Sequence, residues 1–171
     1  MDKEKHRVLT ILMMRFGLSA YVAIPLLKNW LSNHPNKSCE DLSKFLLEGK
    51  VIFKNGILHD VTRGEIIALT NQMRGDRGVE IKNRWYSLKL YPQCFVGSDA
   101  VDWFVNTQKV GREEAIQLGQ MLVARKIIHH VHDDHNFKDE HLFYRFYQDE
   151  TQGKKANSTQ NQAWRDIALD L

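Results

Sequence analysis

The chain has 171 residues, of which 43% are hydrophobic and 26% are charged, and its formal net charge is +3. This length and apolar content allow a buried core, which excludes an extended or low-complexity protein and leaves room for one large domain or two small ones. With only two cysteines, the chain cannot have a framework of several disulfides. Its apolar runs are far shorter than the roughly 20 residues needed to span a membrane, which excludes an integral membrane protein.

Helical spacing of apolar residues predicts two helices at the start of the chain. The first covers the apolar positions of residues 8–16 and ends at Gly17. The second is predicted to begin near Pro25, because the missing N–H of proline costs little in the first turn of a helix. The polar cluster at residues 33–36 is predicted to end it.

A third helix and a hairpin follow. Ser38 and Asp41 have the spacing of a capping box that opens a helix. Residues 51–53 and 57–61 flank an Asn55-Gly56 pair, which is favoured in tight hairpin turns because both positions require positive φ. Three helices and a hairpin are the element order of a winged helix.

A similar order recurs downstream. Thr62 and Glu65 predict a second capped helix, and Tyr86, Leu88 and Leu90 alternate as in a half-buried strand. Ser98 is predicted to be the N-cap of the next helix. Two helices are then predicted from their apolar stripes, the first with Ala100, Val101, Phe104 and Val105 and the second with Ala115, Leu118, Met121 and Leu122. Two strands are predicted to follow, at residues 127–131 and 142–146.

The two halves also share short sequence echoes. Asn29-Trp30-Leu31 is similar to Asp102-Trp103-Phe104, and residues 49–52 are similar to residues 125–128. Because short apolar helices that end in a hairpin are common, the echoes leave open whether residues 1–59 are a second copy of the same unit.

Residues 78–146 contain three apolar blocks in a fixed order, CFVGSDAVDWFV from Cys94, REEAIQLGQMLVARKIIHHV from Arg112 and FKDEHLFYRF from Phe137. Together they resemble the DEP family, which occurs in Dishevelled, pleckstrin and regulators of G-protein signalling. The resemblance implies an α+β, mainly helical, winged-helix-like module that docks to partners and is not an enzyme. We therefore expect a helical, winged-helix-like region at 1–59, a DEP domain at 60–149 and a mostly flexible tail at 150–171.

Basic residues surround the strand that precedes Cys94. In the DEP family, the corresponding hairpin arm is implicated in contacts with acidic phospholipids and membrane receptors. The resemblance thus implies a cytoplasmic adaptor, at most peripheral to the inner face of the membrane, whose partner is a signalling or membrane protein or an acidic phospholipid surface. The candidate membrane-binding or partner-binding residues are Arg74, Arg77, Lys82, Arg84 and Lys89.

A nucleic-acid-binding regulator is the alternative, because the winged helix is also a DNA-reading fold. Residues 1–59 hold nine Lys or Arg against five Asp or Glu, a charge of 9 − 5 = +4. The third helix, however, offers only Lys44 among the acids Glu40, Asp41 and Glu48, whereas groove reading needs several basic or amide side chains. The docking hypothesis is better supported.

The sequence gives less support to metal binding or to catalysis. Four histidines and two aspartates form a dense group: His129, His130, His132, Asp133, Asp134 and His135. On a strand, His130 and His132 would share one face and His129 the other, and two ligands on one strand do not complete a metal site. Cys94 is predicted to be a buried thiol and not a nucleophile. We therefore predict no metal, no cofactor and no catalytic residue.

Overall fold

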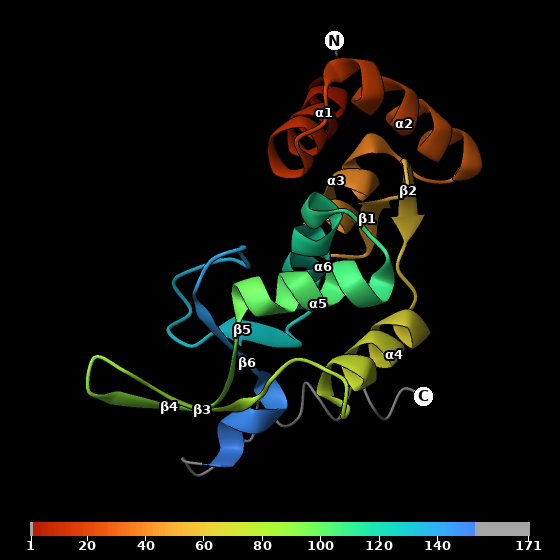
Figure 1. The fold of residues 1–171 in the computed structure, drawn as a ribbon. Helices are drawn as coiled ribbons and strands as arrows, with labels where there is room; N and C mark the ends of the chain where they lie inside the picture. The colour runs from red at the N-terminus through yellow and green to blue at the C-terminus, as the bar shows by residue number, and fades with distance from the viewer. Residues whose placement is uncertain (1, 153–171) are drawn as a thin grey trace.

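The computed structural model describes residues 2–152. The N-terminal elements are three helices and one hairpin, arranged as a group at one end of the molecule (Figure 1). Their bounds are α1 Lys3–Phe16, α2 Ala20–Asn33, α3 Cys39–Leu47, β1 Val51–Lys54 and β2 Ile57–Asp60. One apolar core joins the three helices, with Val8, Leu12, Leu27, Trp30 and Leu42 buried in it.

Three local predictions for this part are confirmed. Gly17 ends α1 in the left-handed region at φ 65°. Ser38 Oγ accepts a hydrogen bond from the backbone N–H of Asp41, and the Asp41 carboxylate accepts one from the N–H of Ser38, which completes the capping box. Asn55 and Gly56 both have positive φ, 50° and 79°, in the turn between β1 and β2.

The predicted start of α2 is wrong. The helix begins at Ala20, and Pro25 lies inside it. Ala23, Leu26 and Leu27 of this helix are buried, so packing on the core favours helix on both sides of the proline. Pro25 removes one intrahelical hydrogen bond, to the carbonyl of Tyr21, whose residue is 92% exposed and therefore open to water.

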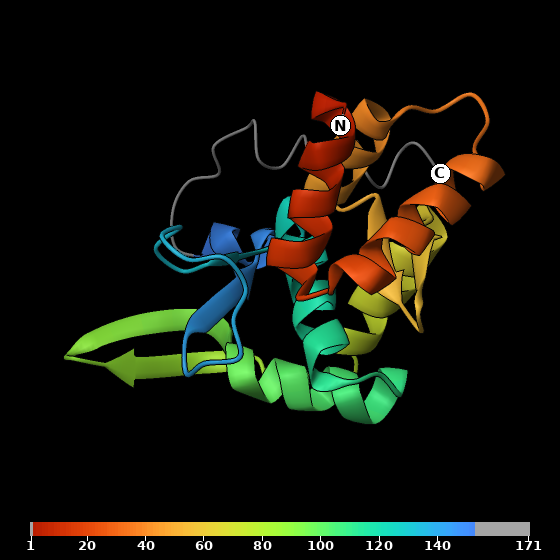
Figure 2. The same ribbon diagram turned by 90° about the horizontal axis from the view of Figure 1, so that it is seen from above.

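The remaining elements form a mixed body of helices around a small antiparallel sheet of order β3-β4-β6-β5 (Figure 2). Their bounds are α4 Arg63–Arg74, β3 Lys82–Tyr86, β4 Lys89–Val96, α5 Gly97–Gln108, α6 Arg112–Ala124, β5 Ile128–His130, β6 Phe143–Phe146 and the 3-10 helix η1 Tyr147–Gln152. Phe95, Phe104, Leu122, Tyr144 and Phe146 are buried in its core. The predicted α+β, mainly helical class is confirmed.

The start of α5 differs from the prediction. Ser98 does not cap it, because Val96 is the N-cap and Gly97 is already helical. The backbone N–H groups of Gly97 and Ser98 instead donate to the carbonyls of Leu142 and Glu140, at 2.9 and 3.0 Å. Carbonyls of the loop before β6 thus accept the hydrogen bonds that a capping side chain accepts at the start of other helices.

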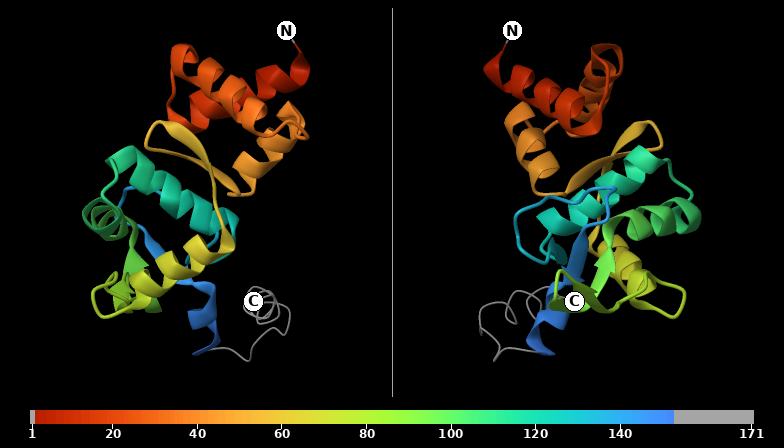
Figure 3. Two further views of the ribbon diagram at one scale, coloured as in Figure 1. Left: turned by 90° about the vertical axis from the view of Figure 1, so that its right-hand side faces the viewer. Right: turned by 60° about the vertical axis from the view of Figure 1, so that its left-hand side comes forward.

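The β1-β2 hairpin contacts both groups of helices (Figure 3). Val51 belongs to the N-terminal core and its neighbour Ile52 to the second core, because successive strand residues face opposite sides. The N–H of Asn55 donates to Glu114 Oε1 at 3.0 Å on α6. The predicted tail at 150–171 lies outside the described residues, except for its first three positions, which belong to η1.

Candidate functional site: the hairpin arm

Strands β3 and β4 form a hairpin, here called the arm, that extends away from the helices (Figures 1 and 2). Trp85 pairs with Leu90 and Tyr86 with Lys89, so a two-residue turn of Ser87 and Leu88 closes it. Of its strands, only the end of β4 near Val96 pairs with β6. Among the strands of residues 2–152, none besides β3 and β4 themselves pairs with the outer half of the arm.

The turn has an unfavourable backbone for its residues. Ser87 and Leu88 both have positive φ, 47° and 63°. Two-residue hairpin turns of this kind favour Asn-Gly, and a bulky residue in the left-handed region costs about 1–2 kcal/mol. Leu88 is also 98% exposed, so burial does not offset that cost.

The outer arm is apolar as well as exposed. Its four exposed large hydrophobic residues, here called the apolar tip, are Trp85 at 72%, Tyr86 at 61%, Leu88 at 98% and Leu90 at 40%. The prediction of a half-buried strand is wrong for this segment. Alternation indicates burial only where another layer covers one face, and the described residues 2–152 leave these four side chains largely uncovered.

Two exposed lysines lie on the arm, Lys89 beside the turn and Lys82 at the base, where it pairs with Cys94. Lys82 is exposed, and its Nζ lies 2.9 Å from Glu80 Oε1. The hydrogen bond from Lys82 lowers the pKa of the Glu80 carboxyl. Lys89 is exposed beside the turn, with its Nζ 5.2 Å from the ring centroid of Tyr91. Both cations are on the surface, where exposed ion pairs contribute little and exchange readily.

The other three candidate residues lie in different settings. The Arg84 side chain is 10% exposed and donates to the carbonyls of Cys94 and Glu80, at 3.4 and 3.3 Å, so it braces the base of the arm. Arg74, at the end of α4, makes a two-pronged ion pair with Asp149 at 2.6 and 2.9 Å. Arg77 is exposed in the turn after α4, and its carbonyl accepts from Trp103 Nε1 at 2.7 Å.

Sequence reasoning missed the residues that fix the base of the arm. Arg145 Nε donates to the carbonyl of Pro92 at 2.8 Å, and the N–H of Gln93 donates to Asn83 Oδ1 at 3.0 Å. Cys94 is buried, as predicted, and burial raises the pKa of its thiol. No local signal in the sequence marks these contacts, since each joins residues at least ten positions apart.

The family model described as "Domain found in Dishevelled, Egl-10, and Pleckstrin (DEP)" matches residues 78–146. These residues are a DEP domain. The prediction of a DEP resemblance is confirmed. Within residues 2–152, no helix is both long and apolar enough to cross a membrane.

Relatives share the DEP domain and little else of their length. Phosphatidylinositol 3,4,5-trisphosphate-dependent Rac exchanger 2 protein of Homo sapiens is 44% identical over 75 residues, which are 43% of this chain and 5% of the relative. Vacuolar membrane-associated protein IML1 of Saccharomyces cerevisiae is 39% identical over 75 residues, which are 43% of this chain and 5% of the relative. The chain thus spans about one twentieth of the length of these relatives.

Solved DEP domains of pleckstrin also match. The human domain is 26% identical, with a TM-score of 0.40 over 50% of this chain and 100% of that domain. The mouse domain is 25% identical, with a TM-score of 0.41 over 46% of this chain and 84% of that domain.

Beside the base of the arm, the DEP domain has a groove of about 240 Å³. Tyr91 Oη and His132 Nε2 lie 3.0 Å apart across it. The groove brings together histidines and aromatic residues from the arm, from β6 and from the loop after β5: Tyr86, Tyr91, His130, His132, His135, His141 and Phe143. The dense group of histidines in the sequence thus lies against the arm.

Proposed function

We propose that this chain is a non-enzymatic signalling adaptor module that docks on an acidic membrane surface through the arm of its DEP domain. The observation that carries the proposal is the apolar tip, whose most distal residue, Leu88, is 98% exposed on a turn that disfavours leucine. Strain without a packing benefit suggests a residue retained for function.

The composition of the arm suits the membrane interface. Trp and Tyr are enriched at the level of lipid headgroups, where an apolar ring and a polar group are both satisfied. Trp85 and Tyr86 supply such rings, and Leu88 supplies a side chain for the acyl boundary. Lys89 lies beside them at the turn, and Lys82 lies at the base of the same arm. Lysine can place its ammonium among anionic headgroups while its stem lies along apolar surface.

The magnitudes point to reversible association. Burial of Leu88 contributes about 1.5–3 kcal/mol, and each of the two lysines contributes about 1 kcal/mol near an anionic leaflet. Their sum, about 3.5–5 kcal/mol, corresponds to a dissociation constant of roughly 0.2–3 mM for the arm alone. Stable residence would then need a second attachment, which fits a module that is one part of a longer signalling assembly.

The five basic residues take different roles in this proposal. Lys82, Lys89 and Arg77 are exposed and supply attraction to the surface. Arg84 and Arg74 act by holding structure, since each is held in short contacts with neighbouring acids or carbonyls. The names of the relatives support the membrane or signalling setting, because one is a phosphatidylinositol 3,4,5-trisphosphate-dependent Rac exchanger and another is a vacuolar membrane-associated protein. We place the module at the cytoplasmic face of a membrane.

The nucleic-acid alternative has less support from the helices that would enter a groove. On α3, Lys44 lies 4.0 Å from Glu48. On α6, Arg112 lies 2.6 and 2.7 Å from the carboxylates of Asp139 and Asp102. The acids Glu113 and Glu114 in the first turn of α6 oppose the approach of phosphates.

Vesicle sedimentation tests the proposal. The chain should bind vesicles that contain acidic lipid, bind neutral vesicles less, and lose binding as salt rises. Trp85→Ser with Leu88→Ser should abolish binding, and Lys82→Glu with Lys89→Glu should weaken it. Tyr21→Ser and Lys28→Glu, at exposed positions of α2, are the matched controls. Equal binding by the control and arm variants would refute docking through the arm, and retention of duplex DNA without vesicle binding would favour the alternative.

A further inference from the structure

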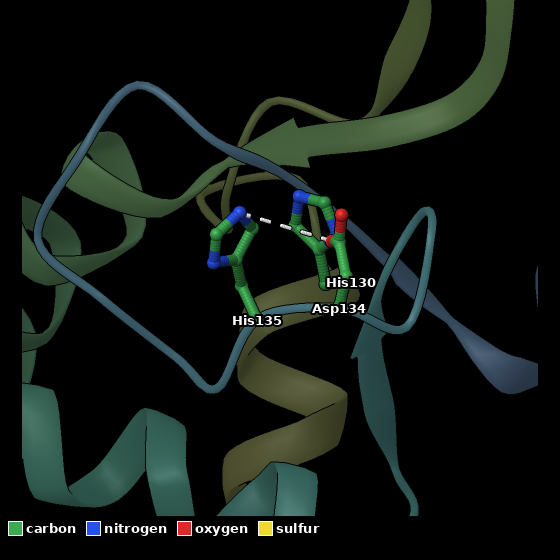
Figure 4. Close-up of side chains that lie close together, drawn as sticks. All are labelled: His130, Asp134 and His135. Carbon is green, nitrogen blue, oxygen red and sulfur yellow. Dashed lines mark ion pairs between the residues drawn. The ribbon is translucent and has the colours of Figure 1, made fainter.

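The loop after β5 gathers three side chains that commonly bind metal ions (Figure 4). His130 Nδ1 lies 2.7 Å from Asp134 Oδ1, and His135 Nε2 lies 3.8 Å from the same oxygen. The ligand atoms of the three residues all lie within 4.8 Å of one another. Bonds of about 2.0–2.2 Å to one tetrahedral zinc ion place neighbouring ligand atoms roughly 3.4 Å apart, so small adjustments bring these three onto one ion.

The loop that carries the three residues is fixed at both ends. On one side, His130 belongs to β5, which pairs with β6. On the other, Phe137 is fully buried against Gly119 of α6, where a Cβ would overlap the phenylalanine ring. Tyr144 Oη also donates to the carbonyl of Asn136 at 2.7 Å. Little conformational freedom is therefore lost when a metal joins these side chains.

The chemistry of the ligands selects the kind of ion. Two imidazoles and one carboxylate are typical ligands of zinc, whereas Mg²⁺ and Ca²⁺ prefer sites built from oxygen alone. Asp134 and His135 are 61% and 39% exposed, so an ion can reach them from solvent.

We propose that His130, Asp134 and His135 form a zinc-binding site whose fourth ligand is water from the adjoining groove. None of its ligands belongs to the apolar tip, so Zn²⁺ binding can be measured separately from membrane docking. Bound zinc would hold the loop of residues 131–142 in place. His132 lies in this loop and contacts Tyr91 of β4, so the ion also stiffens the base of the arm.

Calorimetric titration of the whole chain with Zn²⁺, together with Co²⁺ absorption spectroscopy, tests the site. We expect one equivalent of Zn²⁺ to bind, with no binding of Mg²⁺ or Ca²⁺, and Co²⁺ to give the visible absorption of a four-coordinate ion. Asp134→Asn and His135→Ala should each weaken Zn²⁺ binding at least 10-fold, in line with the loss of one of three ligands. At zinc about 100-fold above its dissociation constant, the melting temperature should rise by roughly 5–10 °C.

The controls separate this site from binding to any exposed histidine. His141 lines the same groove and His6 lies on α1, and both are exposed. His141→Ala and His6→Ala should bind Zn²⁺ like the unmodified chain. Because His130 is buried and its loss can unfold the domain, the test uses the two exposed ligands. Absence of saturable binding below 1 mM, or binding unchanged in Asp134→Asn and His135→Ala, would overturn the proposal.

Discussion

Replacement of Leu88 by glycine should make the protein slightly more stable and also unable to dock. In the folded chain, Leu88 has φ 63° and is 98% exposed, so the substitution removes backbone strain and gives up no buried area. Relief of strain contributes about 1–2 kcal/mol, and the greater freedom of glycine in the unfolded chain offsets about 0.5–1 kcal/mol of it. The net change is a gain of about 0–1.5 kcal/mol in the free energy of unfolding.

The same substitution should weaken membrane binding. Loss of the leucine side chain removes about 1.5–3 kcal/mol of transfer free energy, which is roughly a 10- to 100-fold weaker dissociation constant for acidic vesicles. Urea unfolding measures the first effect and vesicle sedimentation the second. Ser87→Asn is the matched control, because asparagine tolerates positive φ and leaves the apolar tip complete.

Two results would contradict the proposed role of Leu88. A loss of more than 1 kcal/mol in stability on Leu88→Gly would mean that the leucine packs on the folded protein. Unchanged vesicle binding would mean that the apolar tip is not the docking surface.

Three further predictions concern stability. Gly119→Ala should destabilise the DEP domain by about 1–3 kcal/mol in urea unfolding, because the new methyl group overlaps a buried ring; a neutral result would refute the close approach. Arg74→Gln should cost about 1–3 kcal/mol through the Asp149 pair and leave vesicle binding intact; weakened binding with unchanged stability would contradict its structural role. Burial opposes ionisation of Glu65, but hydrogen bonds from Thr62 and His59 lower the pKa of its carboxyl from 4.5 to about 2. A lowered folded-state pKa contributes stability that is full above about pH 4.5 and is lost as pH falls through 2. Since the side chain is 47% exposed, the contribution is about 1 kcal/mol, and Glu65→Gln should remove this part of the acid dependence measured by urea unfolding.

The sequence predicted helix starts and turns correctly where they depend on residues close together in the chain. The capping boxes at Ser38 and Thr62 and the Asn55-Gly56 turn depend on residues within three positions of one another, and all three are confirmed. The predicted start of α2 at Pro25 and the predicted N-cap of α5 at Ser98 were wrong, because contacts with distant residues determine where these two helices begin. Core packing carries α2 past the proline, and carbonyls from a distant loop take the place of a cap at Ser98.

The candidate site was only partly predictable from the sequence. A count of basic residues cannot distinguish Lys89, on the open surface, from Arg84, which is held at the base of the arm, because that difference depends on contacts across the hairpin. The apolar tip was taken for a half-buried strand, since an exposed hydrophobic turn and a covered strand have the same alternation. The group of histidines was judged on the strand geometry of His129, His130 and His132, but β5 ends at His130 and the later members of the group lie in the loop beyond it, where that geometry does not apply.

Quenching of Trp85 fluorescence by lipids brominated on their acyl chains is the most direct measurement of membrane docking through the arm. The difference between the unmodified chain and Trp85→Phe isolates this residue from the other three tryptophans of the chain. We predict that acidic brominated vesicles quench the Trp85 signal and that Lys82→Glu with Lys89→Glu reduces the quenching. A Trp85 signal unaffected by vesicles that do bind the chain would contradict docking through the arm.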